Sequence, residues 1–186
     1  MVQNKNIELE IILDLIKDKS HLREIARSIR ESHSTVLRKI NELVKENIVD
    51  YKKQGKNKVF FIKNNIKSKN YIYSAEIYKL NKLLKKYSEL SVIFEDIKKN
   101  FPKAMIILFG SYAKGNPKPS SDIDIYLETK ENKLKNKIRN INSKLSIKIG
   151  EFDVNSLLIK EIIKNHVIIR GVEEFYERNN FFKVCG

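Results

Sequence analysis

The residues whose types and spacing could do chemistry lie in the segment 106–127, which reads IILFGSYAKGNPKPSSDIDIYL. An apolar run ends at Gly110 and Ser111, and ten residues later Asp122 and Asp124 stand at the start of a second apolar run. Glycine lets a backbone approach a phosphate closely because it has no Cβ. A serine hydroxyl adds a donor where the free N–H groups of a helix start favour anions. The first half of the segment therefore predicts a phosphate-binding turn.

Asp122 and Asp124 predict a metal site beside that turn. Residues two apart on a β-strand point to the same face, so both carboxylates share one face while Ile123 and Ile125 point into the core. Two adjacent carboxylates repel each other unless a cation joins them. Oxygen ligands of this kind suit Mg²⁺ or Mn²⁺, which also bind nucleotide phosphates.

The run GSYAKG could be read as the phosphate loop of a nucleoside triphosphatase. That motif requires a lysine and then a serine or threonine directly after its last glycine. Asn116 and Pro117 stand there instead, which excludes the phosphate loop. A Gly-Ser turn alone is common and Asp-x-Asp alone is a weak signal, so the informative feature is their combination, ten residues apart on two strands.

This combination resembles the signature of the DNA polymerase β-like nucleotidyltransferase superfamily, especially its minimal members, over about residues 92–178. The signature is Gly-Ser, ten residues, then Asp-x-Asp, and this sequence matches it in identity and spacing. The resemblance implies a mixed-sheet, palm-like domain that moves a nucleoside monophosphate, AMP from ATP, onto an acceptor hydroxyl with Mg²⁺ or Mn²⁺. It also implies that Asp122 and Asp124 hold the metal ions.

The resemblance further implies a third carboxylate on a later strand. Asp153 is the preferred residue, because the Val-Asn-Ser-Leu run after it and the helical segments that follow fit the family. Glu151 lies two residues earlier on the same predicted strand face and stays open as the rival. The implied catalytic and metal-binding acids are then Asp122, Asp124 and Asp153.

Four residues carry the implied contacts with the nucleotide: Gly110, Ser111, Lys114 and Ser121. Many family members place a basic residue directly after Gly-Ser, whereas this chain has Tyr112 there and its nearest basic residue is Lys114. The third zone, about residues 102–186, is too small to contain a separate acceptor-reading domain. The acceptor must then be recognised by the rest of the chain, by a second copy or by another protein.

The elements that must position these residues fall into three zones. In residues 102–186 strands alternate with helical stretches, among them a polar one at about 131–145, and Ala104–Phe109 reads as a buried strand. Residues 70–101 contain neither Gly nor Pro and carry apolar residues at three-to-four spacing, which predicts a long connecting helix with an open question of a break near Ser88.

Residues 1–69 carry three short helical signals and then a hairpin signal around QGKNK. This order resembles the winged helix-turn-helix domain over residues 21–63. The third helix is expected to turn five apolar residues inward, which are Val36, Leu37, Ile40, Leu43 and Val44. In that fold the third helix enters the major groove and the hairpin touches the DNA backbone. The implied DNA-binding residues are Ser34, Thr35, Arg38, Lys39, Lys52, Lys53, Lys56 and Lys58.

The charge balance fits an anionic partner. The chain of 186 residues has a formal net charge of +14, and residues 47–69 contain seven lysines against one acid, Asp50. A cationic hairpin suits phosphate contacts, which position a protein on DNA without specifying a sequence. Duplex DNA is the preferred partner, and the alternative is a protein-docking module whose lysines are a solvated face.

We therefore expect an α+β chain with a winged helix-turn-helix domain at 1–69, a connecting helix at 70–101 and a nucleotidyltransferase domain at 102–186. The connecting helix is also a candidate surface for a homodimer, since winged-helix proteins commonly read two half-sites as dimers. The one cysteine, Cys185, has no internal partner, and no uncharged apolar run approaches membrane-spanning length. A cytoplasmic protein without membrane contact is the expectation.

Two functions from different classes stay open. The first is an active nucleotidyltransferase targeted by the winged domain, and it is favoured because none of the three implied carboxylates is missing. Minimal nucleotidyltransferases often act in toxin–antitoxin pairs and modify a helical HEPN-type toxin with AMP, so the resemblance names a HEPN-type protein as a partner. The second is a DNA-binding regulator whose transferase domain senses a nucleotide or is inactive.

Overall fold

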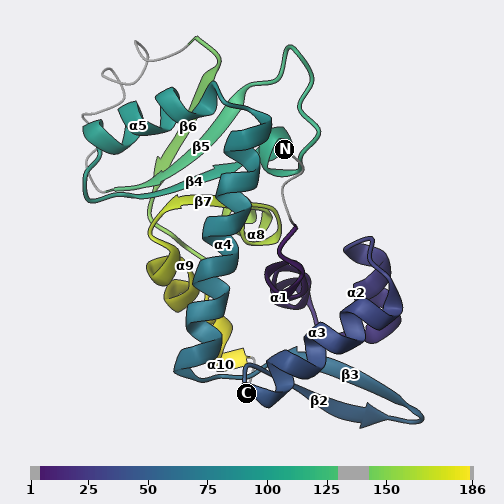
Figure 1. The fold of residues 1–186 in the computed structure, drawn as a ribbon. Helices are drawn as coiled ribbons and strands as arrows, with labels where there is room; N and C mark the ends of the chain where they lie inside the picture. The colour runs from purple at the N-terminus through teal and green to yellow at the C-terminus, as the bar shows by residue number, and fades with distance from the viewer. Residues whose placement is uncertain (1–4, 130–142, 185–186) are drawn as a thin grey trace. The chain divides into compact units, whose positions relative to one another are not determined.

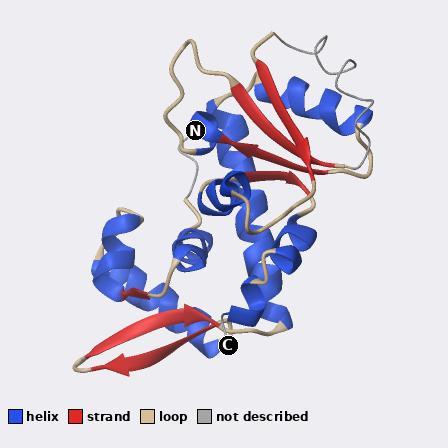
Figure 2. Ribbon diagram, turned by 180° about the vertical axis from the view of Figure 1, so that it is seen from behind, coloured by secondary structure: helices blue, strands red, loops and turns tan. Residues whose placement is uncertain are grey.

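The computed structural model describes residues 5–129 and 143–184, and the polar helical stretch predicted at about 131–145 falls almost entirely outside them. The fold is α+β, with helices and two separate sheets (Figure 1; Figure 2). The chain divides into two compact units. The first contains Met1–Tyr78 and Phe181–Gly186, and the second contains Lys79–Asn180.

The first unit has the element order of a winged helix-turn-helix. Its elements are α1 (Ile7–Lys17), β1 (Ser20–His21), α2 (Leu22–Ser28), α3 (His33–Lys45), β2 (Val49–Gln54) and β3 (Asn57–Ile62). β2 and β3 form an antiparallel hairpin, and β1 pairs with the other edge of β3. The predicted three helices followed by a hairpin are confirmed.

Local chemistry accounts for α3 and for the hairpin turn. Ser32 caps α3, because its hydroxyl oxygen accepts a hydrogen bond from the Thr35 N–H at 3.1 Å. The side chains that α3 buries are those of Val36, Ile40 and Leu43. Gly55 supplies the φ of +61° at the tip of the hairpin. The expectation that Leu37 points inward is wrong, because this residue is 40% exposed.

The predicted connecting helix is two helices rather than one. α4 runs over Ile66–Lys86 and α5 over Leu90–Asn100, and the chain turns between them. Tyr87, in this turn, packs edge-on against Tyr112 with ring centroids 5.2 Å apart. This aromatic pair fixes the turn to the core of the second unit, where α5 buries most of its apolar residues.

The last helix packs with the first unit. α10 (Phe181–Val184) clusters with the winged helix-turn-helix rather than with the sheet that precedes it in the sequence. The Asn64 side-chain amide donates to the Phe182 carbonyl oxygen at 2.8 Å, and the Lys69 ammonium lies 4.8 Å from the centre of the Phe182 ring. The end of the predicted 102–186 segment is therefore not part of the second unit.

The second unit is built on a four-stranded mixed sheet. Its remaining elements are β4 (Met105–Phe109), α6 (Gly110–Ala113), β5 (Ile123–Glu128), β6 (Leu145–Gly150), α8 (Leu157–Lys164), β7 (Val167–Arg170) and α9 (Val172–Arg178). The strand order is β6-β5-β4-β7, with β4 antiparallel to both neighbours and β5 parallel to β6. The predicted mixed sheet and the fully buried strand β4 are confirmed.

The two faces of this sheet are covered differently (Figure 1). α5 packs on the face that carries Ile123 and Ile125, both of which are buried as predicted. The opposite face carries Asp124 and Tyr126, and an aromatic cluster that includes Phe152 and Phe175 covers its centre. Among the described helices, none combines the length and apolar character that a membrane span requires.

Candidate functional site

The Gly-Ser turn and the Asp-x-Asp motif meet at one end of this second face. β4 and β5 are antiparallel and pair Phe109 with Asp124, so the chain leaves β4 directly beside that carboxylate. Gly110 turns away with a φ of +69°, and a Cβ placed on it would lie 2.2 Å from Asp124 Oδ2. A Cβ at this position would overlap the carboxylate unless the Asp124 side chain moved, and the positive φ also favours glycine. The two motifs therefore form one site.

The two carboxylates of the motif differ in their surroundings. Asp122 is exposed and lies one residue before β5, whereas Asp124 is half-buried within the strand. Burial raises the pKa of Asp124 above its ordinary value, and the charge of Asp122 acts in the same direction. A hydrogen bond with the Ser146 side chain and the charge of Lys148 oppose this rise.

The donor set fits a divalent cation that also binds phosphate. Mg²⁺ is usually held by one or two carboxylates and takes its other ligands from substrate phosphates and water. Asp122 and Asp124 supply two such carboxylates at the protein surface. Within residues 5–129 and 143–184, no group of three His, Cys, Asp or Glu side chains is arranged to hold a metal ion. The protein's share of such a site is therefore this pair.

The structure does not bring the predicted third carboxylate to this end of the sheet. Asp153 was expected on a strand, but β6 ends at Gly150 and Asp153 lies in the turn that follows. Its carboxylate there accepts a hydrogen bond from the Asn155 N–H at 2.9 Å. β5 and β6 are parallel, with Asp124 opposite Ser146, so Asp153 lies beyond the far end of both strands, about 13 Å or more along the sheet.

Glu151, the rival for the third carboxylate, lies at that same far end. It lines a cavity of about 390 Å³ together with Glu128, Glu174 and Arg178. Burial raises the pKa of Glu128, and the guanidinium of Arg178, which pairs with it, acts against this rise. The sequence shows how far Glu151 and Asp153 lie from Asp124 along the chain, but not how β6 pairs with β5. That pairing places both residues at the opposite end of the strands from Asp124.

The position beside Asp124 on β6 is held by a serine. Ser146 is the register partner of Asp124, and Lys148 is the partner of Tyr126, so both point to the face that carries Asp124. Sequence reasoning missed both residues. The segment LSIKIG has the alternation of a strand, but nothing in it indicates which strand it joins.

Ser121 and Lys114, two of the residues predicted to contact the nucleotide, have side-chain partners. Ser111 is half-buried in the first turn of α6. The Ser121 hydroxyl accepts a hydrogen bond from the Lys118 N–H at 2.8 Å and so closes the loop before β5. The Lys114 ammonium forms an ion pair of 2.9 Å with Glu161 of α8, a residue that sequence reasoning missed. Tyr112, the residue directly after Gly-Ser, belongs to the buried core.

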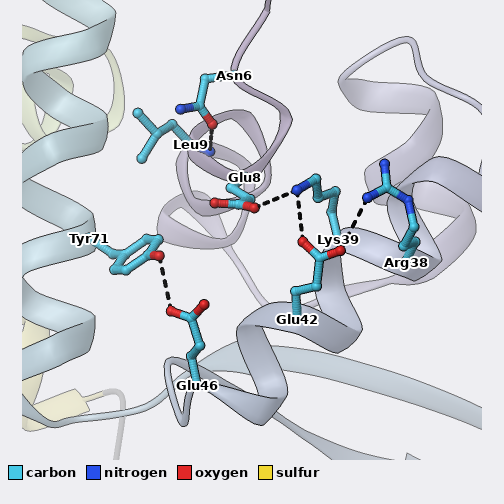
Figure 3. A network of polar contacts seen from close by, with 8 residues as sticks. All are labelled: Asn6, Glu8, Leu9, Arg38, Lys39, Glu42, Glu46 and Tyr71. Atoms are coloured by element: carbon cyan, nitrogen blue, oxygen red, sulfur yellow. Dashed lines mark hydrogen bonds and ion pairs between the residues drawn. The ribbon is translucent and has the colours of Figure 1, made fainter.

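In the first unit, two of the predicted DNA-binding residues are committed to ion pairs (Figure 3). The Lys39 ammonium lies 2.7 Å from Glu8 of α1 and 2.7 Å from Glu42, and Arg38 pairs with Glu42 at 3.1 Å. The Tyr71 hydroxyl of α4 donates to Glu46 at the end of α3. Lys39 thus joins α3 to α1. Of the other predicted residues of α3, Ser34 is exposed and Thr35 is half-buried at the start of the helix.

The hairpin of β2 and β3, which is the wing of the first unit, carries its lysines at the surface. The hairpin lysines predicted to bind DNA are Lys52, Lys53, Lys56 and Lys58, and all four are exposed. None of them has an acidic partner among the described residues. The Lys58 ammonium lies 3.8 Å from the centre of the Tyr51 ring, a cation–π contact that orients it. A groove of about 470 Å³ runs between the wing and α3, where Leu37 and Asn41 line it.

Three comparisons with known proteins bear on this arrangement. Residues 91–181 match the family model described as "Polymerase beta, Nucleotidyltransferase". No curated protein matches the chain. Among solved structures, the adhesin competence repressor of Streptococcus pyogenes is similar at 18% identity and a TM-score of 0.35, covering 54% of this chain and 81% of its own. A likeness this weak identifies neither the fold nor the function of this chain.

Proposed function

We propose, from the match of residues 91–181 to the polymerase β nucleotidyltransferase family model, that the chain is a metal-dependent nucleotidyltransferase that moves AMP from ATP onto an acceptor hydroxyl. The observation that supports this most is the contact of Gly110 with the Asp124 carboxylate. It joins the Gly-Ser turn to a pair of carboxylates suited to the cation of a nucleotide.

Each residue of the site has a distinct task in this proposal. Asp122 and Asp124 hold Mg²⁺ or Mn²⁺, which supplies positive charge to the phosphates when it is bound. Gly110 lets the chain turn directly against Asp124, and the Ser111 hydroxyl donates to the oxygens of the triphosphate. The acceptor oxygen bonds to the α-phosphorus, the bond to the bridging oxygen breaks and pyrophosphate leaves. The acceptor proton passes to water, since Asp153 and Glu151 lie at the far end of the sheet.

The acceptor and the DNA lie outside the transfer site. We place the acceptor hydroxyl on a partner protein, a HEPN-type toxin in a toxin–antitoxin pair, because the described residues of the second unit form one sheet with its helices and no separate acceptor-reading domain. We assign duplex DNA to the first unit, because its wing presents exposed lysines. A homodimer through α4 is supported by Ile77, which is 54% exposed on that helix.

A second function is favoured by one specific observation. Ser146 stands beside Asp124 where a third carboxylate would complete a two-metal site, and Lys148 follows it on the same face. A site with two carboxylates can bind a nucleotide with its cation and yet transfer slowly or not at all. The chain would then be a DNA-binding regulator that senses the nucleotide.

Transfer of label from ATP distinguishes the two functions. Purified protein with Mg²⁺ and ATP labelled at the α-phosphate, given the candidate partner, should label the partner, and Asp124→Asn should abolish the labelling. Glu177→Gln on α9 removes one exposed carboxylate of the same unit and serves as the control. ATP binding without any labelling would establish the sensor, and labelling that survives in Asp124→Asn would refute the site.

A further inference from the structure

We propose that Lys148 is the side chain that contacts the nucleotide phosphates, and that Lys114, the cation expected from the sequence, is withheld by Glu161. This inference rests on the proposed function, since it requires a nucleotide at the Gly110–Asp124 site. It names a binding residue on β6 that neither the family match nor the motif assigns.

The strand register places Lys148 on the correct face. β6 is the edge strand of the sheet, and its parallel pairing sets Ser146 opposite Asp124 and Lys148 opposite Tyr126. Residues two apart on a strand share a face, so Lys148 projects on the side of the sheet that carries the Asp124 carboxylate. Lys148 is exposed, and a lysine stem is long enough to lie along the strand toward the Asp124 end.

Lys148 carries its charge on the face of the sheet that also carries Asp124. Lys148 has no acidic partner within ion-pair distance among the described residues, so its ammonium is available to a ligand. An anion that binds beside Asp122 and Asp124 needs positive charge from the protein as well as from its cation, and Lys148 supplies it.

Lys114 is in the opposite situation. Its ammonium is 2.9 Å from the Glu161 carboxylate, and the two side chains are 41% and 48% exposed. A phosphate that is to bind Lys114 must replace this carboxylate and overcome its repulsion. An exposed pair of this kind contributes little to stability, but it lowers the net gain from moving Lys114 to a ligand. Glu161 therefore makes Lys148 the stronger phosphate contact.

The test compares the two lysines by the equilibrium binding of ATP with Mg²⁺. Lys148→Gln should weaken binding about 10-fold or more, as expected for the loss of a hydrogen bond between charged groups. Lys114→Gln should weaken it much less. Lys99→Gln removes the same charge from α5, on the other face of the sheet, and should leave the affinity unchanged. Thermal unfolding of each variant shows whether the fold is kept.

Glu161→Gln provides the second arm. Releasing Lys114 should strengthen ATP binding, and in the Lys148→Gln background it should recover part of the lost affinity. An affinity unchanged in Lys148→Gln, or a larger loss in Lys114→Gln, overturns this inference alone. A wild-type protein that binds no ATP overturns the proposed function together with it.

Discussion

The close approach of Gly110 to Asp124 depends on the Cβ that glycine lacks. The Asp124 carboxylate occupies the space into which any other residue at position 110 would project its Cβ. The left-handed backbone at Gly110 adds a second requirement for glycine. Both requirements can be separated experimentally, because Gly115 has a similar φ of +77° but nothing within 4 Å of its Cβ position.

Gly110→Ala is predicted to damage the site more than Gly115→Ala. Both substitutions introduce backbone strain, but only the first forces a carbon into the Asp124 carboxylate. The free energy of unfolding should fall about 1–3 kcal/mol further in Gly110→Ala than in Gly115→Ala, and ATP binding should be lost only in Gly110→Ala. Urea unfolding and equilibrium binding measure the two effects. Equal losses in both variants would show that the close approach of Gly110 to Asp124 has no consequence.

Ser146→Asp is predicted to strengthen the binding of divalent cations. The new carboxylate would stand beside Asp124 on the neighbouring strand, where the site has a hydroxyl now. A third carboxylate should tighten Mn²⁺ binding, measured by electron paramagnetic resonance, because more charge and more oxygen ligands raise affinity. Ser88→Asp, between α4 and α5, is the control. Unchanged Mn²⁺ affinity in Ser146→Asp would place the metal away from Asp124.

At the scale of elements, the sequence predicted most helices and strands but not how the strands pair with one another. Periodicity predicted the helices and strands of the winged unit, because it reports which side chains are inside, and a continuous apolar run predicted the buried strand β4. The Gly-Ser and Asp-x-Asp spacing predicted a turn beside a carboxylate pair. The site residue Asp153 was not predictable in the same way, because its place depends on the parallel register of β5 and β6, which is a long-range pairing.

The helix α3 shows a second limit of sequence reasoning. Basic residues on a recognition helix suggest DNA binding, but the sequence cannot show that Glu8, on another helix, lies within 2.7 Å of Lys39. The wing lysines, by contrast, have no acidic partner among the described residues. We therefore divide the predicted DNA-binding residues into a wing group that is available to phosphates and a group on α3 that is partly engaged.

The wing lysines are predicted to control DNA affinity. Lys56→Glu combined with Lys58→Glu should weaken binding to duplex DNA and reduce the slope of log affinity against log salt, by about 0.9 for each phosphate that the protein no longer neutralises. Lys39→Gln should leave both quantities nearly unchanged, because its ammonium is held by Glu8 and Glu42. Fluorescence anisotropy over a range of salt concentrations measures both. A wild type without salt-dependent binding would favour a protein-docking role for this unit.

The α3 network is predicted to make stability depend on pH. Hydrogen bonding from Lys39 lowers the pKa of Glu42 below its ordinary value near 4.5, and the charges of Lys39 and Arg38 add to this. A carboxyl with a lowered pKa stabilises the folded chain above its ordinary pKa and loses this effect as the pH falls through the lowered value. Urea unfolding should show Glu42→Gln less stable than wild type at pH 7 and equally stable near pH 2. A constant difference would contradict this linkage.

At the scale of the whole molecule, the chain combines two units with different chemistry. The first has the fold of a winged helix-turn-helix with an exposed cationic hairpin, and the second contains the polymerase β nucleotidyltransferase match. The residues behind the charge of +14 include the exposed wing lysines and lysines of the second unit such as Lys148. Both proposed ligands carry several phosphates, so the excess of lysines attracts each of them.

Whether duplex DNA and ATP compete for the same site is a property of the whole molecule. The wing lysines and the residues around Asp124 lie in different units, so we expect duplex DNA and ATP with Mg²⁺ to bind at separate sites. A saturating amount of DNA should leave the number of ATP sites unchanged, measured by equilibrium dialysis at a fixed salt concentration. Complete displacement of ATP by DNA would mean that both ligands use the same lysines.

The central claim, that the nucleotide and its cation bind at the Gly110–Asp124 end of the sheet, is tested most directly by a crystal structure with Mn²⁺ and a non-hydrolysable ATP analogue. The anomalous signal of Mn²⁺ distinguishes the metal from every atom of the protein. We predict a peak between the carboxylates of Asp122 and Asp124, with the phosphates beside Gly110. A peak at the far end, among Glu128, Glu151 and Glu174, or no bound metal at either end, would contradict the claim.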